Sequence, residues 1–213
     1  ICVMPTGAGK SAVYQVPAMT LPGTAVVISP LIALQRDQAD AINEAAGTTC
    51  AFVLNSAQPQ GYWDDAWAAA RGDDGAGKAK FLFLGPEQVA REEVLEQLRG
   101  LDVSLLVIDE AHCVSAWGHD FRPDYLQLDL LVRALDKPVV ALTATAAPPV
   151  RAEIADQLGL RSPLQISLGF DRPNLHLAAA RYEDAEDKRR AVLEQAGQLA
   201  FPGLVYVATR KET

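Results

Sequence analysis

Cysteine pairs are missing from this sequence of 213 residues. Its three cysteines, Cys2, Cys50 and Cys113, are odd in number and far apart, and they form no metal-ligand spacing. This pattern is typical of reduced thiols inside a cell, so we expect an intracellular, cytoplasmic protein.

Long apolar runs are missing too. None approaches the roughly 20 residues of a membrane span, and the apolar start at residues 1–4 ends at Pro5 without the basic leader of a signal peptide. We therefore expect no membrane partner. Internal repeats and low-complexity tracts are not evident. The first residues fall inside a strand pattern and the last follow another, so we expect a piece of a longer protein.

The sequence also lacks an excess of positive charge. The 19 Lys and Arg residues are outnumbered by 27 Asp and Glu residues, which gives a net charge of −8. That sign is wrong for a protein that holds phosphate backbones by bulk electrostatics, so any contact with nucleic acid must be local. The remaining composition, 49% hydrophobic and 22% charged, is that of an ordinary globular protein.

Short apolar runs alternate with helical patterns along the chain. The pairing of Trp63 with Trp67, four residues apart on one such helix, is more typical of core packing than of base stacking. Strands that alternate with helices predict an α/β fold with a doubly wound parallel sheet. The expected buried strands are residues 1–4, 25–28, 50–54, 81–84, 105–108 and 139–142, and helices are expected from residues 11, 31, 87 and 148 onward.

A domain boundary is expected near residues 169–174. Beyond it we predict strands around residues 175–179 and 204–207, with a charged helix at residues 184–199 between them. The predicted division is a first domain at residues 1–168, and a linker with the truncated beginning of a second α/β domain at residues 169–213. The second piece is too small to be stable alone.

A glycine-rich loop, residues 5–11, joins the first expected strand to a helical stretch, as a phosphate-binding loop requires. Glycines let backbone N–H groups converge on phosphate oxygens at a helix N-terminus. Lys10 would reach the β- and γ-phosphates, and the Ser11 hydroxyl would coordinate Mg²⁺. Because Met4 replaces the first glycine of G-x-x-x-x-G-K-[ST], an ordinary turn is the alternative. The predicted nucleotide-binding residues are Thr6, Gly7, Ala8, Gly9, Lys10 and Ser11.

Two acids, Asp109 and Glu110, directly follow the apolar strand at residues 105–108. Ligands of open α/β sheets bind at the carboxyl ends of strands, although a solvated acidic turn is the alternative. Asp109 would share Mg²⁺ with Ser11, and Glu110 would orient and deprotonate the attacking water. Since each motif supplies what the other needs, they predict a nucleoside triphosphatase with Lys10, Asp109 and Glu110 as its catalytic residues.

Two further segments carry polar residues near strand ends. Ser29 and residues 35–38 could touch a sugar–phosphate chain, but the pattern alone favours a solvated helix face. Thr143 and Thr145 end the strand at residues 139–142 and could bond to the acidic turn, or could cap the helix after Pro148.

Together these motifs resemble those of superfamily 2 helicases, and in particular the RecQ DNA helicases. The resemblance covers essentially the whole chain, and the aromatic-rich segment separates RecQ proteins from other DEAH helicases. The matching segments are residues 5–11 (motif I), 29–38 (motif Ia), 109–112 (the DEAH sequence of motif II), 114–125 (the aromatic-rich loop), 143–145 (motif III), 170–175 (the interdomain segment) and 203–210 (motif IV).

The resemblance implies a RecA-like P-loop NTPase domain with a mainly parallel sheet, plus the start of a second RecA-like domain. It implies ATP and Mg²⁺ as cofactors and single-stranded and duplex DNA as partners. The whole protein would be an ATP-dependent 3′–5′ DNA helicase of repair and recombination, associated with the nucleoid if bacterial. A DEAH or DEAD RNA helicase, and a non-enzymatic DNA-binding protein with a vestigial site, are the alternatives.

The resemblance also implies residues that couple DNA to ATP. Trp117 and Phe121 would contact DNA, and His119 and Arg122 would relay its presence to the ATP site. The further coupling residues are His112, Thr143 and Thr145. From pattern alone, the aromatic side chains Trp117, Phe121 and Tyr125 pack under a loop instead. Gln88 stands where the family usually has arginine, so the resemblance does not carry a phosphate contact over to this position. The adenine-recognition segment and the arginine finger of the family lie outside this chain, so we expect no unwinding by this chain alone.

Overall fold

The computed structural model describes residues 1–73, 78–115, 122–169, 175–198, 200 and 203–207. The chain divides into two compact units, Ile1–Arg172 and Pro173–Thr213. Each is described by itself.

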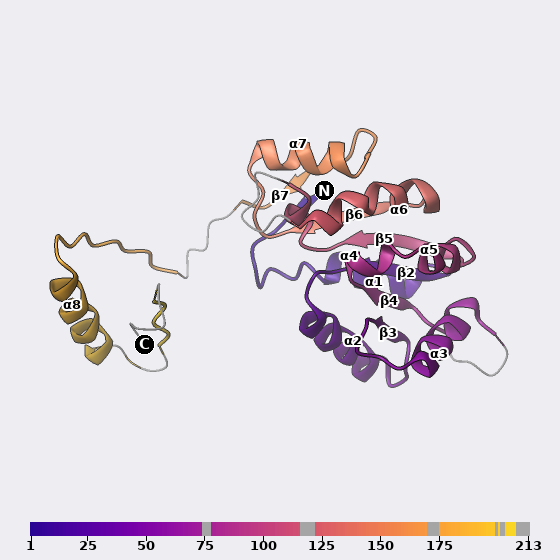
Figure 1. Cartoon of the computed structure of the whole chain (residues 1–213), viewed down its shortest axis with the longest axis horizontal. Helices are drawn as coiled ribbons and strands as arrows, with labels where there is room; N and C mark the ends of the chain where they lie inside the picture. Colours follow the sequence, from indigo (N-terminus) through magenta and orange to yellow (C-terminus); the bar gives the residue numbers. More distant parts are fainter. Residues whose placement is uncertain (74–77, 116–121, 170–174, 199, 201–202, 208–213) are drawn as a thin grey trace. The chain divides into compact units, whose positions relative to one another are not determined.

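The first unit is built on one sheet of seven strands in the order β3-β4-β2-β5-β6-β1-β7 (Figure 1). Every pairing among them is parallel, which confirms the predicted doubly wound α/β fold. The strands are β1 (Cys2–Val3), β2 (Thr24–Ile28), β3 (Ala51–Leu54), β4 (Phe81–Leu84), β5 (Val103–Ile108), β6 (Val139–Thr143) and β7 (Ile166–Ser167).

Helices cover both faces of this sheet (Figure 1). Side chains alternate along each strand, so in β5 Leu105 and Val107 join the core beneath α1 and α2, while Leu106 and Ile108 join the core on the other face. This double burial explains why the strands are continuous apolar runs. The helices of this unit are α1 (Ala12–Thr20), α2 (Ile32–Ala46), α3 (Gln60–Arg71), α4 (Pro86–Val89), α5 (Glu92–Arg99), α6 (Leu128–Leu135) and α7 (Pro148–Gln157), with 3₁₀ turns η1 (Ala111–Val114) and η2 (Pro123–Gln127).

Three details of the first unit differ from the sequence prediction. Strand β7 and helix α6 were not predicted, and the helix expected from residue 87 is interrupted between α4 and α5, where Arg91 has an extended backbone with φ of −84° and ψ of 122°. Trp63 and Trp67 are buried in the core, as predicted, with ring centroids 6.4 Å apart.

The second unit contains helix α8 (Ala185–Gln198), which buries no side chain. The strands predicted around residues 175–179 and 204–207 are wrong, because the structure has no regular secondary structure at either place. A strand needs a neighbour with which to pair its backbone groups, and the described residues of this unit form no sheet that it could join. Its described residues therefore give no sign of a second RecA-like domain.

In the described part of the chain, no helix combines the length and the apolar character that crossing a membrane requires.

Candidate nucleotide-binding site

The glycine-rich loop connects the end of β1 to the start of α1. Gly7 and Gly9 have φ of 82° and 81°, a left-handed conformation that strains any residue with a β-carbon. Short backbone bonds hold the loop, from Ala8 N to the Pro5 carbonyl at 3.1 Å and from Ala12 N to the Gly9 carbonyl at 3.0 Å. The N-cap residue of α1 is Ser11, whose side chain makes no capping bond. The predicted strand–loop–helix arrangement is therefore present.

Lys10 folds over its own loop. Its Nζ lies 3.5 Å from the carbonyl oxygen of Met4, and the side chain is half-buried. An ammonium group held there is a positive charge at the mouth of a loop whose N–H groups already favour anions.

The two acids occupy the carboxyl end of β5, which lies between β2 and β6 in the sheet. Asp109 is 6% exposed, and its Oδ1 accepts a bond of 2.9 Å from the backbone N–H of Glu110. Glu110 has the left-handed conformation, with φ of 47° and ψ of 44°, which is uncommon for a residue with a long side chain. Such strain is found where function fixes a side-chain direction.

The electrostatics of Asp109 favour a cation. Burial, and then the neighbouring Glu110 carboxylate, raise the pKa of Asp109, while Lys10 acts in the opposite direction. A divalent cation would relieve both unfavourable effects. Within the described residues no group of three or more His, Cys, Asp and Glu side chains could hold a metal unaided. Asp109 and Ser11 line the same cavity, and this pair of oxygen ligands fits Mg²⁺, which is bound through one or two carboxylates together with substrate phosphates.

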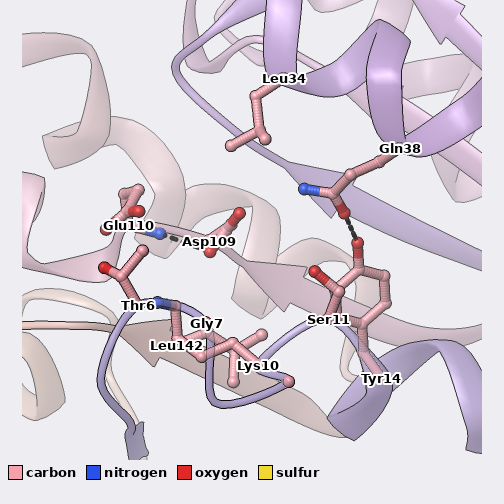
Figure 2. A pocket seen from close by; sticks show the side chains of 11 residues that line it. Thr6, Gly7, Lys10, Ser11, Tyr14, Leu34, Gln38, Asp109, Glu110 and Leu142 are labelled. Carbon is pink, nitrogen blue, oxygen red and sulfur yellow. Dashed lines mark hydrogen bonds between the residues drawn. The ribbon is translucent and has the colours of Figure 1, made fainter. Parts of the chain in front are cut away.

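The loop and the acids line one cavity of about 410 Å³ (Figure 2). Its volume is in the range of small-molecule sites. Of the predicted nucleotide-binding and catalytic residues it contains all but Ala8, which is exposed on the loop. Four lining residues were not predicted as part of a nucleotide site: Tyr14, Leu34, Gln38 and Leu142. The full lining is Thr6, Gly7, Gly9, Lys10, Ser11, Tyr14, Leu34, Gln38, Asp109, Glu110 and Leu142.

His112 connects the acidic turn to the end of β6. Its Nδ1 lies 2.9 Å from Thr143 Oγ1 and 3.2 Å from Glu110 Oε2. Its Nε2 lies 3.9 Å from the Cys113 sulfur, and this contact, followed by the Glu110 carboxylate, raises the pKa of His112 to about 9. The raised pKa favours the protonated form of His112 beside Glu110.

Thr143 and Thr145 lie together at the end of β6. Thr143 Oγ1 accepts a bond of 3.2 Å from the backbone N–H of Thr145. Neither caps the following helix, because the N-cap of α7 is Ala147 and has no side-chain bond. The capping alternative is therefore wrong, and the alternative contact with the acidic turn is present through His112.

The segment that follows residues 116–121 returns to the acidic turn. Tyr125 is buried and donates from its hydroxyl to the carbonyl oxygen of Asp109 at 3.1 Å, and Arg122 Nη1 lies 3.5 Å from the Pro30 carbonyl. The packing interpretation thus holds for Tyr125. The other predicted residues of this segment, Trp117, His119 and Phe121, lie outside the described residues.

The two glutamine side chains of the motif Ia segment, and Gln88, are buried or half-buried rather than exposed on the surface. Gln35 is fully buried and donates from Nε2 to the Ser29 carbonyl at 2.6 Å, so the solvated-face interpretation fails for this residue. Gln38 lines the cavity, whereas Arg36 is exposed. Gln88 is buried and accepts from Arg91 Nη1 at 3.2 Å.

A family model described as DEAD/DEAH box helicase matches residues 1–153. The chain is 42% identical to the ATP-dependent DNA helicase RecQ of Bacillus subtilis, over 99% of this chain and 35% of that protein. It is 37% identical to the ATP-dependent DNA helicase RecQ of Haemophilus influenzae, over 100% of this chain and 33% of that protein. The chain therefore spans about a third of the length of these relatives.

The fold is similar to that of a solved helicase domain. The crystal structure of the Pyrococcus furiosus Hef helicase domain matches 81% of this chain and 35% of that chain, with a TM-score of 0.58 and 22% identity. At that identity the likeness concerns the α/β fold alone.

Proposed function

This chain belongs to the DEAD/DEAH box helicase family, and from that premise we propose that it is the ATP-hydrolysing part of a RecQ-type DNA helicase. The resemblance to RecQ helicases is confirmed by relatives that match nearly the whole chain. One observation carries the proposal: the glycine-rich loop and the Asp109–Glu110 pair, about 100 residues apart in sequence, line the same cavity.

The proposed roles follow from the positions of the side chains. Backbone N–H groups of the loop from Thr6 to Ser11 bind the phosphates, and Lys10 balances their charge. Ser11 and Asp109 would hold Mg²⁺, which supplies positive charge to the phosphoryl oxygens when bound. Glu110, with its backbone fixed in the left-handed conformation, orients the attacking water and accepts its proton.

We assign the coupling role to residues around the acidic turn. His112 contacts Glu110 and Thr143, so a shift of η1 would move the side chain that positions Glu110, the proposed general base. Arg122 belongs to the aromatic-rich loop and lies 3.5 Å from the Pro30 carbonyl of the motif Ia segment, and this contact supports a link between two segments proposed to contact DNA. In this proposal Trp117 and Phe121 contact single-stranded DNA, whose bases stack on aromatic rings without sequence preference. His119 and Thr145 complete the relay.

The whole protein would move 3′–5′ along single-stranded DNA and unwind duplexes in repair and recombination, and its DNA substrate would place it in the cytoplasm, at the nucleoid if bacterial. Residues 1–168 would be the first RecA-like domain, and residues 169–213 a linker and the beginning of the second. The division of the chain into compact units at Arg172 and Pro173 supports a boundary in this region. This chain alone would not unwind DNA, because the adenine-recognition segment and the arginine finger that the resemblance implies lie outside it.

The first test separates the roles of the two acids in the whole protein. Glu110→Gln is expected to keep Mg²⁺-dependent ATP binding, because Asp109 remains, and to lose turnover by about 100-fold or more, as expected when a general base is removed. Lys10→Ala is expected to abolish hydrolysis. Binding is measured by fluorescent-nucleotide titration and turnover by phosphate release. Loss of binding and turnover together in Glu110→Gln would contradict the division of roles.

The same assay distinguishes the nucleic acid. Phosphate release by the wild-type protein is expected to rise with single-stranded DNA and to stay near its basal rate with RNA of the same sequence. A larger response to RNA would favour an RNA helicase, and no nucleotide binding at all would favour a vestigial site.

A further inference from the structure

Gln38 lies in the nucleotide cavity although it belongs to a different part of the chain from the phosphate loop and the acids. It lies on α2, is half-buried, and lines the cavity together with Ser11 and Asp109 (Figure 2). Arg36, two residues earlier on α2, is exposed, so Gln38 lies on the side of the helix that borders the cavity.

The orientation of the Gln38 amide is set by Tyr14. The Tyr14 hydroxyl donates a hydrogen bond to Gln38 Oε1. Tyr14 itself cannot move freely, because it is 1% exposed and its ring packs edge-on against Phe81 with centroids 6.3 Å apart. Burial raises the pKa of Tyr14, so its hydroxyl stays protonated and remains a donor at working pH.

This arrangement leaves the amide nitrogen of Gln38 as the group that faces the cavity. Because Oε1 is engaged by Tyr14, the two N–H donors of Nε2 point the other way, and Figure 2 shows the nitrogen turned away from Tyr14. The cavity is the one that joins the phosphate loop to the proposed metal-holding carboxylate, so an uncharged donor here suits an anionic oxygen.

We propose that Gln38 contacts the terminal phosphate of bound nucleoside triphosphate through Nε2, and that Tyr14 is the positioning residue that presents it. This inference rests on the proposed function. Lys10, Ser11 and Asp109 serve the region of the β- and γ-phosphates. Gln38 lies on α2, across the cavity from the loop (Figure 2), and its donor contributes to recognition of the third phosphate. The pair thereby helps the site to distinguish a triphosphate from a diphosphate.

The test measures affinity rather than turnover. Fluorescent forms of a non-hydrolysable ATP analogue and of ADP are titrated, with Mg²⁺, into the whole protein and its variants. Gln38→Ala is expected to weaken binding of the triphosphate analogue by about 10-fold or more, as expected when a hydrogen bond to a charged group is removed, and to change ADP binding by less than about two-fold. Gln38→Met, which keeps the length of the side chain, is expected to behave in the same way.

Tyr14→Phe keeps the ring against Phe81 and removes only the hydroxyl. It is expected to give a smaller loss with the same selectivity for the triphosphate. Adding Tyr14→Phe to Gln38→Ala is expected to cause no further loss, because the two residues act as one unit. Gln157→Ala removes an exposed glutamine at the end of α7, outside the cavity, and serves as the matched control with unchanged affinities.

The outcomes separate this inference from the proposed function. If the wild-type protein binds neither nucleotide, both fall. If it binds both, and Gln38→Ala and Gln38→Met bind the triphosphate as tightly as wild type or lose both nucleotides equally, the proposed role of Gln38 is wrong while the site assignment stands. Additive losses in the double variant would overturn the role of Tyr14.

Discussion

At the scale of single residues, one buried hydroxyl supports the backbone of the acidic turn. Tyr125 is 0% exposed, and its hydroxyl donates to the carbonyl oxygen of Asp109. Asp109 is the residue directly before Glu110, whose backbone has the strained left-handed conformation. The carbonyl oxygen would otherwise lie in the core without this donor. The direction of both acids therefore depends on a residue that lies outside the cavity.

Tyr125→Phe tests this support in the 213-residue chain. It keeps the ring but leaves a buried acceptor without its partner, so we expect the free energy of unfolding to fall by about 1–3 kcal/mol. Urea denaturation gives the value. Tyr206 is 90% exposed, and Tyr206→Phe should change stability by less than about 0.5 kcal/mol. Equal effects of the two substitutions would show that the Tyr125 bond contributes nothing.

The raised pKa of His112, caused first by its contact with Cys113 and then by the Glu110 carboxylate, predicts a dependence of stability on pH. The folded-state pKa of about 9 lies above the unfolded value of 6.5, so the stabilisation is fully present below about pH 6.5 and is lost as pH rises through about 9. The shift corresponds to an upper bound of about 3 kcal/mol. We expect the stability difference between wild type and His112→Gln to shrink between those values. A difference that does not change with pH would contradict the protonated pair.

The site residues that could be predicted from sequence lie in local motifs, whereas those that could not are brought to the cavity by the packing of helices. Lys10, Asp109 and Glu110 are recognisable because each lies within a local motif at a strand end. Gln38 and Tyr14 come from helices, and only packing of α1 and α2 on the same face of the sheet brings them to the cavity. Gln38 belonged to a segment already noted for its polar residues, but helix periodicity alone could not distinguish a cavity wall from a solvated face.

At the scale of elements, β5 is the strand on which the core and the site both depend. It lies between β2 and β6, and its apolar residues contribute to the cores on both faces. Apolar runs made the central strands predictable from sequence. The short edge strand β7 has exposed residues and, among the described strands, pairs with β1 alone, so no local pattern marks it. The strands expected in the second unit failed for the complementary reason, since an apolar run without a neighbouring strand forms no sheet.

Leu106→Ala tests the central position of β5. The side chain is 0% exposed, and its truncation is expected to lower the free energy of unfolding by about 2–5 kcal/mol. Leu130→Ala on α6 is the control, because Leu130 is 57% exposed and should cost less than about 1 kcal/mol. Urea denaturation at neutral pH measures both, and a similar cost for the two would contradict the assigned core.

At the scale of the whole molecule, the net charge of −8 limits how nucleic acid can be held. The proposed binding of single-stranded DNA cannot rely on a general positive field, so we expect its contacts to be few and local. The salt dependence of binding reports the number of these contacts. For single strands, a plot of log affinity against log salt concentration has a slope of about −0.7 for each phosphate neutralised.

We expect a shallow salt dependence for this chain. Anisotropy titrations with a labelled oligonucleotide, between about 50 and about 200 mM salt, should give a slope with magnitude of about 3 or less. A slope of about 6 or more would reveal an extended cationic surface, and would contradict the local mode of contact.

The place of β1 in the sheet also constrains how the protein is made. β1 precedes the other six strands of the sheet, yet it pairs with β6 and β7, at Leu142 and Ile166 opposite Cys2. During synthesis on the ribosome, the phosphate loop therefore emerges long before the strands that will hold it. A nascent chain that ends before β6 has the complete loop motif but no scaffold for it, so under the proposed function ATP is not expected to stabilise the early folding intermediates. Capture of the nucleotide is expected only after β6, the strand that follows α6, has left the ribosome.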